Sequence, residues 1–260
     1  MTLTISVVSH RQGQLVRDLL TSLQVHKPSC SFEVVLTLNT SEPDPTAGLK
    51  LTYPVKVIMN YVPYGFGKNH NRAFSISKGS YFCVLNPDIV FIEEVYSLLI
   101  KEMESLKAGI IAPGILDGSG EVQDNFRKLP TPGRLLARCL GGSRTDDLAV
   151  VNERGLAFPD FISGMFLLLK SSAFKELGGF EERYFLYFED VDLSLRCRFA
   201  GHPVVVDTRI KVIHEAQMSS HRSLRYLWWH TMSALRFFTS SLFWRALKQR
   251  GYAKAKTKIS

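Results

Sequence analysis

Long hydrophobic runs are missing from this sequence of 260 residues. It has no window of about 18 consecutive apolar residues, which argues against a membrane-spanning helix. The first segment, MTLTISVVSHR, has no basic region ahead of its short apolar run, so we interpret it as a β-strand and not as a secretion signal. We therefore expect a cytoplasmic protein.

Cysteine is scarce and scattered. The sequence contains four cysteines, none in a CxxC pair and none with a histidine at zinc-finger spacing. This pattern argues against a disulfide framework or a structural zinc site, and it favours buried free thiols in a reducing compartment. The four are Cys30, Cys83, Cys139 and Cys197.

Acidic residues are absent after Glu215, whereas nine lysines and arginines follow it, from Arg222 to Lys258. Residues 1–215 carry the other 23 basic side chains against all 24 acidic ones, a net charge of −1. The overall charge of +8 therefore belongs to the C-terminal part of the chain. Such an uneven charge concerns the partners of a protein and not its fold.

Strand-like and helix-like patterns alternate through the first part of the chain. This alternation predicts an α/β fold with a mainly parallel sheet. The region 114–160 is rich in Gly, Pro and Arg and is predicted to form loops. The expected strands are 4–9, 32–39, 55–60 and 81–86, with helices at 13–26, 68–79 and 92–107, a strand and short helix within 161–180, and a hairpin-like pair of strand fragments at 202–215.

Polar residues follow the predicted strands: Ser9, Asn39, Asn60 and the run Asn86-Pro87-Asp88. Ligands of open α/β sheets bind beyond the carboxyl ends of the strands. Asp88 could hold a metal ion against a diphosphate or cap a following helix, and the spacing alone leaves both open.

The loop YGFGKNHNRA contains two glycines, Gly65 and Gly67, followed by Asn69 and Asn71 at the start of a predicted helix. Glycines let the backbone approach a ligand closely, and a helix N-terminus favours anions such as phosphate. A tight turn with an asparagine cap explains the same residues, and on this loop alone it is the better interpretation.

The stretch YFLYFEDVDLSLRCRFAG places three carboxylates directly after a group of aromatic side chains. We predict a helix that begins at Glu189 or Asp190, in which Asp192 pairs with Arg196 one turn later. Asp192 is then a structural residue. Asp190 either caps the helix or, beside Glu189 and the aromatics, acts as a general base with a raised pKa.

Seven segments follow one another along the chain: SVVSHR, YGFGKNHNRA, LNPDI, FRKLP, ISGMFLLLK, GGFEERYFLYFEDVDLSLRCRFAG and VIHEAQMSSHRS. In this order they resemble inverting family 2 glycosyltransferases of the GT-A fold, most of all bacterial rhamnosyltransferases of O-antigen and related polysaccharide assembly. The resemblance runs from residue 1 to about 240. It implies a Rossmann-like domain at 1–215, with a mainly parallel mixed sheet, and a helical extension at 216–260.

The resemblance also implies an activity and a role for each matching residue. The activity is transfer of L-rhamnose from dTDP-L-rhamnose to a saccharide linked to a polyprenyl diphosphate, with inversion. Asp190 would be the base and Glu189 would orient it or the acceptor, while Asp88 and His214 would meet Mg²⁺ or Mn²⁺. His214 is also explained as an ordinary strand-end histidine.

Further residues are implied to lie at the nucleotide-sugar. These are Ser9, Asn39, Gly65, Gly67, Asn69, Asn71, Asn86, Arg127 and Arg222. For Arg127 and Arg222 the alternative is a solvated position on the surface, although either could bind phosphate through paired hydrogen bonds.

Two positions depart from the family pattern. Asn86 stands where a two-carboxylate metal motif has Asp, and Leu38 stands where many relatives have an Asp that helps to read the base. These departures leave open a different UDP-, GDP- or dTDP-sugar, and also a non-catalytic scaffold that binds a nucleotide-sugar at a membrane. The presence of both Glu189 and Asp190 argues against the scaffold.

The C-terminal part combines basic residues with an apolar helical stripe. Such helices lie in the interface of anionic membranes, here the cytoplasmic face of the inner membrane, but the stripe could instead pack on the core. We expect the first turns to pack and the lysines to meet lipid. No recognition motif for nucleic acid accompanies the charge, so no nucleic-acid partner is expected. The stripe consists of Leu224, Leu227, Trp228, Leu235, Phe238 and Leu242.

Overall fold

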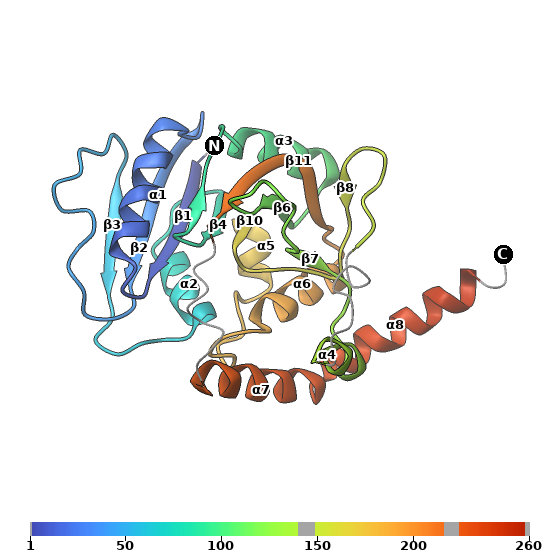
Figure 1. The fold of residues 1–260 in the computed structure, drawn as a ribbon. Coiled ribbons are helices and arrows are strands. Elements are labelled where there is room, and N and C mark those ends of the chain that lie inside the picture. Colours follow the sequence, from blue (N-terminus) through green and yellow to red (C-terminus); the bar gives the residue numbers. More distant parts are fainter. Residues whose placement is uncertain (1, 140–148, 216–223, 258–260) are drawn as a thin grey trace.

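The computed structural model describes residues 2–139, 149–215 and 224–257 (Figure 1). Within these residues a central sheet has the strand order β3-β2-β1-β4-β10-β6-β11-β5, and β8 pairs with β11. Its strands are β1 (Thr2–Ser9), β2 (Ser31–Leu38), β3 (Val55–Met59), β4 (Tyr81–Leu85), β5 (Ile89–Val90), β6 (Ile110–Leu116), β8 (Leu156–Ala157), β10 (Phe166–Lys170) and β11 (Val204–His214). A small second sheet pairs β7 (Phe126–Arg127) with β9 (Phe161–Ile162).

The long strands run in one direction, apart from β10. Strands β1 to β4 pair in parallel, β10 lies antiparallel between β4 and β6, and β11 is parallel to β6. The ends of β1, β2, β3, β4, β6 and β11 therefore meet at one edge of the sheet. This edge holds the polar residues that follow the strands.

Helices cover both faces of the sheet. On one face α1 (Gly13–Val25) and α3 (Tyr96–Leu106) bury an apolar stripe against the sheet, and on the other face α2 (Phe66–Ser75), α5 (Ser171–Glu176) and α6 (Glu189–Phe199) do the same. Strand β4 is buried along its whole length, as expected for a parallel strand covered on both sides. The predicted α/β architecture is confirmed.

The C-terminal helices do not form a separately packed unit. Helices α7 (Leu224–Phe238) and α8 (Ser241–Thr257) share a third apolar cluster with α6, in which Phe188, Val191 and Leu195 meet Phe237 and Phe243. Figure 1 shows α7 crossing one edge of the molecule and α8 continuing away from it. The division of the chain at residue 215 stays a prediction.

Three details differ from the sequence-based expectations. Residues 204–214 form one strand with an irregularity between Asp207 and Lys211, where the Asp207 carboxylate accepts a hydrogen bond from the Arg209 amide (3.1 Å) and imitates a turn. Helix α3 begins at Tyr96, so Glu93 and Glu94, which were expected in its first turn, precede it. The region 114–160 holds β7, β8 and a short helix, α4 (Pro132–Cys139), in addition to loops.

The predicted thiols are free. Cys83 and Cys197 are buried and Cys30 is half-buried, without a disulfide among them. The side chain of Cys139 lies outside the described residues.

Candidate active site

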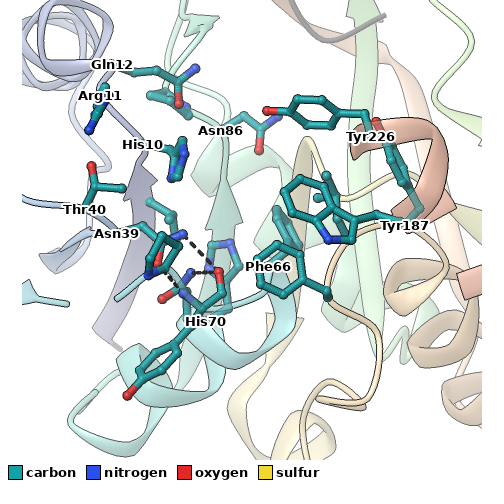
Figure 2. A pocket seen from close by; sticks show the side chains of 18 of the residues that line it. His10, Arg11, Gln12, Asn39, Thr40, Phe66, His70, Asn86, Tyr187 and Tyr226 are labelled. Carbon is teal, nitrogen blue, oxygen red and sulfur yellow. Dashed lines mark hydrogen bonds between the residues drawn. The ribbon is translucent and has the colours of Figure 1, made fainter. Parts of the chain in front are cut away.

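A cavity of about 520 Å³ lies at the carboxyl edge of the sheet. Figure 2 shows the loop after β1 and the end of β2 on one side of it, facing aromatic residues from segment 185–187 and from α7. Its polar and aromatic lining residues include His10, Arg11, Gln12, Asn39, Thr40, Tyr64, Asn69, His70, Asn86, Asp88, Tyr187, Arg225, Tyr226 and Trp229.

The loop after β1 is held by a carboxylate that the sequence analysis did not single out. Glu42 accepts hydrogen bonds from the Ser9 hydroxyl (2.9 Å) and the Arg11 amide (3.0 Å), and the Gln12 amide donates to the same hydroxyl (3.2 Å). Arg11 has a positive φ of 60°. Ser9 does not line the cavity; it positions the neighbouring residues that do.

Three asparagines connect β2, β3 and α2. The amide of Asn60 donates to Asn39 (2.9 Å) and to Asn69 (2.7 Å), and Asn39 pairs with both backbone groups of Tyr64 (2.9 and 3.0 Å). Buried amides that satisfy one another make a rigid wall. Asn39 and Asn69, which were predicted to lie at the nucleotide-sugar, line the cavity. Asn60 does not line it and holds the other two in place.

The two glycines of the loop are required by packing against the segment that leads to the carboxylates. A Cβ atom on Gly65 would lie 2.6 Å from the carbonyl oxygen of Phe185, and one on Gly67 would lie 2.6 Å from Cβ of Phe180. The Phe66 amide donates to the same Phe185 carbonyl (2.8 Å). These glycines bring the loop and the acidic segment into contact.

Asn71 does not line the cavity. Its side chain accepts from the Phe180 amide (2.8 Å) and donates to the Phe180 carbonyl (2.9 Å). These paired hydrogen bonds fasten α2 to the segment before the carboxylates.

Asp88 and His214 lie together, because β5 pairs antiparallel with the end of β11. Nε2 of His214 is 3.3 Å from Oδ2 of Asp88, and Nδ1 is 2.9 Å from Oε1 of Gln123. Because Nδ1 faces the Gln123 oxygen, Nε2 is the ring nitrogen that is turned toward the carboxylate. Two electron-pair donors that face each other in this way suit a cation.

The other oxygen of Asp88, Oδ1, is buried and has no hydrogen-bond partner within the described part of the chain. Carboxylate oxygen is a preferred ligand of Mg²⁺, which usually takes only one or two protein carboxylates and completes its coordination with water and phosphate oxygens. Among the described residues, no group of three or more His, Cys, Asp or Glu side chains is arranged so that it could hold a metal ion. The pair could supply two ligands to a divalent cation, whose other ligands would come from outside the described residues.

The acidic pair stands at the same edge of the sheet, beside the cavity. Oδ2 of Asp190 accepts a hydrogen bond from the Gly164 amide (3.1 Å). The carbonyl of the next residue, Met165, accepts one from the Asn86 amide (2.9 Å). Leu186 and Tyr187 line the cavity, whereas Glu189 and Asp190 do not. The backbone of Gly164 and Met165 thus connects the acidic pair to the strand end that carries Asn86 and Asp88.

The surroundings separate the roles of the two carboxyls. Burial, followed by the charge of Asp190, raises the pKa of Glu189 well above its usual range, and Oε2 has no hydrogen-bond partner among the described residues. Burial also raises the pKa of Asp190, but hydrogen bonds from the Val191 and Gly164 amides stabilise its ionised form. These surroundings favour the protonated form of Glu189 more strongly than that of Asp190, so Asp190 is the better candidate for a base.

Two consecutive residues before Glu189 have left-handed backbone conformations. Tyr187 has a φ of 71° and Phe188 a φ of 68°. Such conformations are costly for aromatic residues and persist only where the surrounding structure enforces them. Asp192, by contrast, pairs with Arg196 (2.5 Å) as predicted.

Neither of the two arginines that were expected at the nucleotide-sugar is seen to line the cavity. Arg127, on β7, forms an ion pair with Asp124 (2.5 Å) and lies outside the cavity lining, although its charge acts on Asp190. Arg222 lies outside the described residues. Asn86 lines the cavity beside Asp88.

Several residues of the site were not found by sequence reasoning. Tyr226 and Trp229 reach the cavity from α7, and their only signal was the aromatic content of the C-terminal part. His70 accepts or donates a hydrogen bond with Ser6 (2.8 Å), and burial lowers its pKa to about 3, so the ring is neutral. Gln123 comes from the region that was predicted as loop.

A family model described as Glycosyl transferase family 2 matches residues 4–177. Among characterised relatives, rhamnosyltransferase WbbL of Escherichia coli K12 is 27% identical over 199 residues, which are 73% of this chain and 74% of that protein. The N-acetylglucosaminyl-diphospho-decaprenol L-rhamnosyltransferase of Mycobacterium tuberculosis H37Rv is 31% identical over 177 residues, 63% of this chain and 57% of that protein.

Solved structures share the fold at low sequence identity. Staphylococcus aureus TarS 1-349 in complex with UDP-GlcNAc superposes with a TM-score of 0.62 and 15% identity, covering 93% of this chain and 68% of that one. GalNAc-T7 with UDP, GalNAc and Mn²⁺ gives a TM-score of 0.63 and 15% identity, covering 84% and 44%. These likenesses establish the GT-A architecture.

Proposed function

Because this chain belongs to glycosyltransferase family 2, we propose that it transfers L-rhamnose from dTDP-L-rhamnose to a saccharide carried on a polyprenyl diphosphate, with inversion, in the assembly of O-antigen or another cell-surface polysaccharide. The chain is a hexosyltransferase of the GT-A fold. One observation carries the proposal: Asp88, which His214 contacts, and the segment that leads to Glu189 and Asp190 line one cavity.

The choice of sugar and acceptor is supported by the relatives. Both are named rhamnosyltransferases, and the name of the mycobacterial protein gives a saccharide on decaprenol diphosphate as its acceptor. UDP- or GDP-sugars remain the alternative donors, because fold neighbours are complexes with UDP-GlcNAc and with GDP-Man.

Asp88 and His214 would hold Mg²⁺ or Mn²⁺, which neutralises the negative charge that develops on the departing nucleoside diphosphate. Gln123 fixes the tautomer of His214 and keeps Nε2 turned toward Asp88. Asn86, next to Asp88, supplies a neutral amide where a second carboxylate would add charge.

Asp190 would remove the proton from the acceptor hydroxyl as that oxygen attacks the anomeric carbon. A single displacement of this kind inverts the configuration, because the attacking oxygen arrives opposite the leaving group. The left-handed turn at Tyr187 and Phe188 leads into the helix that carries Asp190, and the raised pKa of Glu189 disfavours a second negative charge beside it.

We place the protein at the cytoplasmic face of the inner membrane, with residues 216–260 in contact with lipid. This follows from the lipid-linked acceptor and from the basic charge after Glu215. None of the described helices is long and apolar enough to cross a bilayer.

The direct test is transfer itself. The full chain is incubated with a polyprenyl-diphosphate-linked acceptor and Mg²⁺ and is offered dTDP-L-rhamnose, a UDP-sugar or a GDP-sugar in turn. Thermal shifts with each donor, with and without the metal, report binding separately. We expect stabilisation and transfer with the dTDP-sugar; transfer from another donor only would contradict the sugar, and binding without any transfer would favour the scaffold.

A further inference from the structure

Helix α7 has two distinct faces, and the inner face holds the segment 183–188 that leads into the acidic pair. The segment has no regular structure of its own, so these contacts define its path. They comprise a hydrogen bond from Ser233 Oγ to the Leu186 carbonyl (2.9 Å), a stack of Trp229 on Phe185 (4.6 Å between ring centroids), and the ring of His230 beside Tyr187 and Phe188 (5.2 and 5.5 Å).

The opposite side of α7 is apolar and exposed. We define the outer face as Leu224, Leu227, Trp228, Met232 and Leu235, which recur at the spacing of one helical face. Leu224 is 85% exposed and Trp228 62% exposed. Among the described residues nothing covers this face, and contiguous apolar surfaces of this kind mark sites of interaction.

This arrangement overturns the expected packing of the first turns of the predicted stripe, whereas its last two members, Phe238 and Leu242, do pack against the third apolar cluster. Leu224, Leu227, Trp228 and Leu235 were candidates for packing on the core, but they point outward. The core instead receives Ser233, Ala234 and Phe237 from the other face of the helix. The aromatic segment 183–188 provides the partner that this inner face requires.

Charge identifies the kind of partner. Arg225 and Arg236 fall on the border of the outer face, Arg245 and Lys248 follow on α8, and no acidic residue occurs after Glu215. An apolar face with basic residues at its border suits the interface of an anionic bilayer. A symmetric contact with a second copy would bring the arginines of two chains together without acidic partners.

We infer that the outer face of α7 docks on an anionic lipid surface and that the same helix, through its inner face, brings the mouth of the cavity to that surface. Arg225, Tyr226 and Trp229 line the cavity from α7, one helical turn or less from the docking residues. The inference rests on the proposed function, because a lipid-linked acceptor would then reach the cavity from the lipid surface. Docking itself does not depend on any transfer.

The test uses the full chain, since removal of α7 would strip the segment 183–188 of its contacts. Trp228→Glu and Leu235→Glu are compared with Leu98→Glu, which replaces an exposed leucine on α3 (48% exposed). Binding is measured by co-sedimentation with vesicles of phosphatidylglycerol and phosphatidylethanolamine, and with vesicles of phosphatidylcholine alone. We expect at least tenfold weaker binding to anionic vesicles for both α7 variants and no change for the α3 variant.

Fluorescence provides a second measurement that needs no disruptive change. The three tryptophans of the sequence, Trp228, Trp229 and Trp244, all lie on α7 and α8. Brominated lipid should quench the emission of the unaltered protein, and Trp228→Phe should lower that quenching. Absence of quenching in the unaltered protein would overturn the inference even if the glutamate variants failed to fold.

Other outcomes also decide the matter. Equal binding of all three glutamate variants, or equal binding to neutral and anionic vesicles, would contradict docking through this face. A dimer that forms without lipid and dissociates in Leu235→Glu would assign the face to a second copy. Vesicle binding through α7 without sugar transfer would refute the proposed function and leave the docking inference intact. Sugar transfer without vesicle binding would refute the docking inference and leave the proposed function intact.

Discussion

Replacing Asp190 by Asn should abolish transfer while leaving the fold in place. The change removes the base and keeps the size of the side chain. Loss of a general base costs roughly 10²- to 10⁴-fold in rate, which corresponds to about 3–6 kcal/mol at about 1.4 kcal/mol per factor of ten. The assay is transfer to the lipid-linked acceptor at saturating donor.

The effect on stability is expected to be small for a structural reason. Asp190 accepts two backbone hydrogen bonds, from Gly164 (3.1 Å) and Val191 (2.8 Å). The amide oxygen of an asparagine can keep one of them, and a neutral bond is weaker than a charged one by roughly 1 kcal/mol. Removing a poorly solvated charge offsets this loss. The net change should stay within about 1 kcal/mol, or about 2–4 °C in the melting temperature.

Asp192→Asn is the matched control, two residues along the same helix. Its carboxylate pairs with the Nε atom of Arg196 (2.5 Å) and is partly buried. The control should lose roughly 1–2 kcal/mol of stability, because the arginine keeps only a neutral partner, and it should retain transfer. Donor-induced thermal shifts should be unchanged in both variants.

Asp190→Asn is thus expected to lose transfer but keep its stability, and Asp192→Asn to keep transfer but lose some stability. This contrast tests the assignment of the base. If Asp190→Asn keeps transfer within tenfold of the unaltered enzyme while Asp192→Asn loses it, the base is not Asp190. If both variants melt early and both lose activity, the effect at Asp190 is structural and the reasoning fails as well.

The remaining predictions concern the metal, the glycine contact and pH. Asp88→Asn, like chelation by EDTA, should remove the thermal shift caused by the donor and Mg²⁺; full activity in EDTA would contradict the metal site. Gly65→Ala should destabilise the protein by roughly 1–3 kcal/mol, since its Cβ would lie 2.6 Å from a backbone oxygen, whereas Gly118→Ala meets nothing within 4 Å and should be neutral. The raised pKa of Glu189 means that the folded chain binds its proton more tightly than the unfolded chain, so its contribution to stability falls as pH rises above the ordinary carboxyl range. Glu189→Gln should therefore melt at a higher temperature than the unaltered protein at pH 8 and at a similar one at pH 4; an identical pH dependence of both would contradict burial of this carboxyl.

Local patterns were sufficient to predict most of the architecture. The strands that became β1, β2, β3 and β4 were recognisable as short runs rich in apolar and β-branched residues, which are typical of strands. The error at β11 arose where Asp207 and Arg209 satisfy each other locally, which in a sequence is indistinguishable from a turn. The pairing of Asp192 with Arg196 was predictable, since helical spacing alone determines it.

The site was only partly predictable. Asn39, Asn86 and Asp88 were found because strand ends of a parallel sheet share one edge. Asn69 was named from the glycine loop at the start of α2 and from the family resemblance. Glu42 was missed because its role depends on a fold in which its loop returns to the end of β1.

The sequence by itself determined the alternation of strands and helices, the polar residues at the strand ends and the confinement of the basic charge to the C-terminal part, because these depend on residue order and spacing. Only the tertiary structure decided which face of α7 packs, that His214 meets Asp88, and that the acidic pair lies beside the cavity. Each of these depends on contacts between segments far apart in the chain, and such contacts follow from how sheet edges and helix faces meet in space.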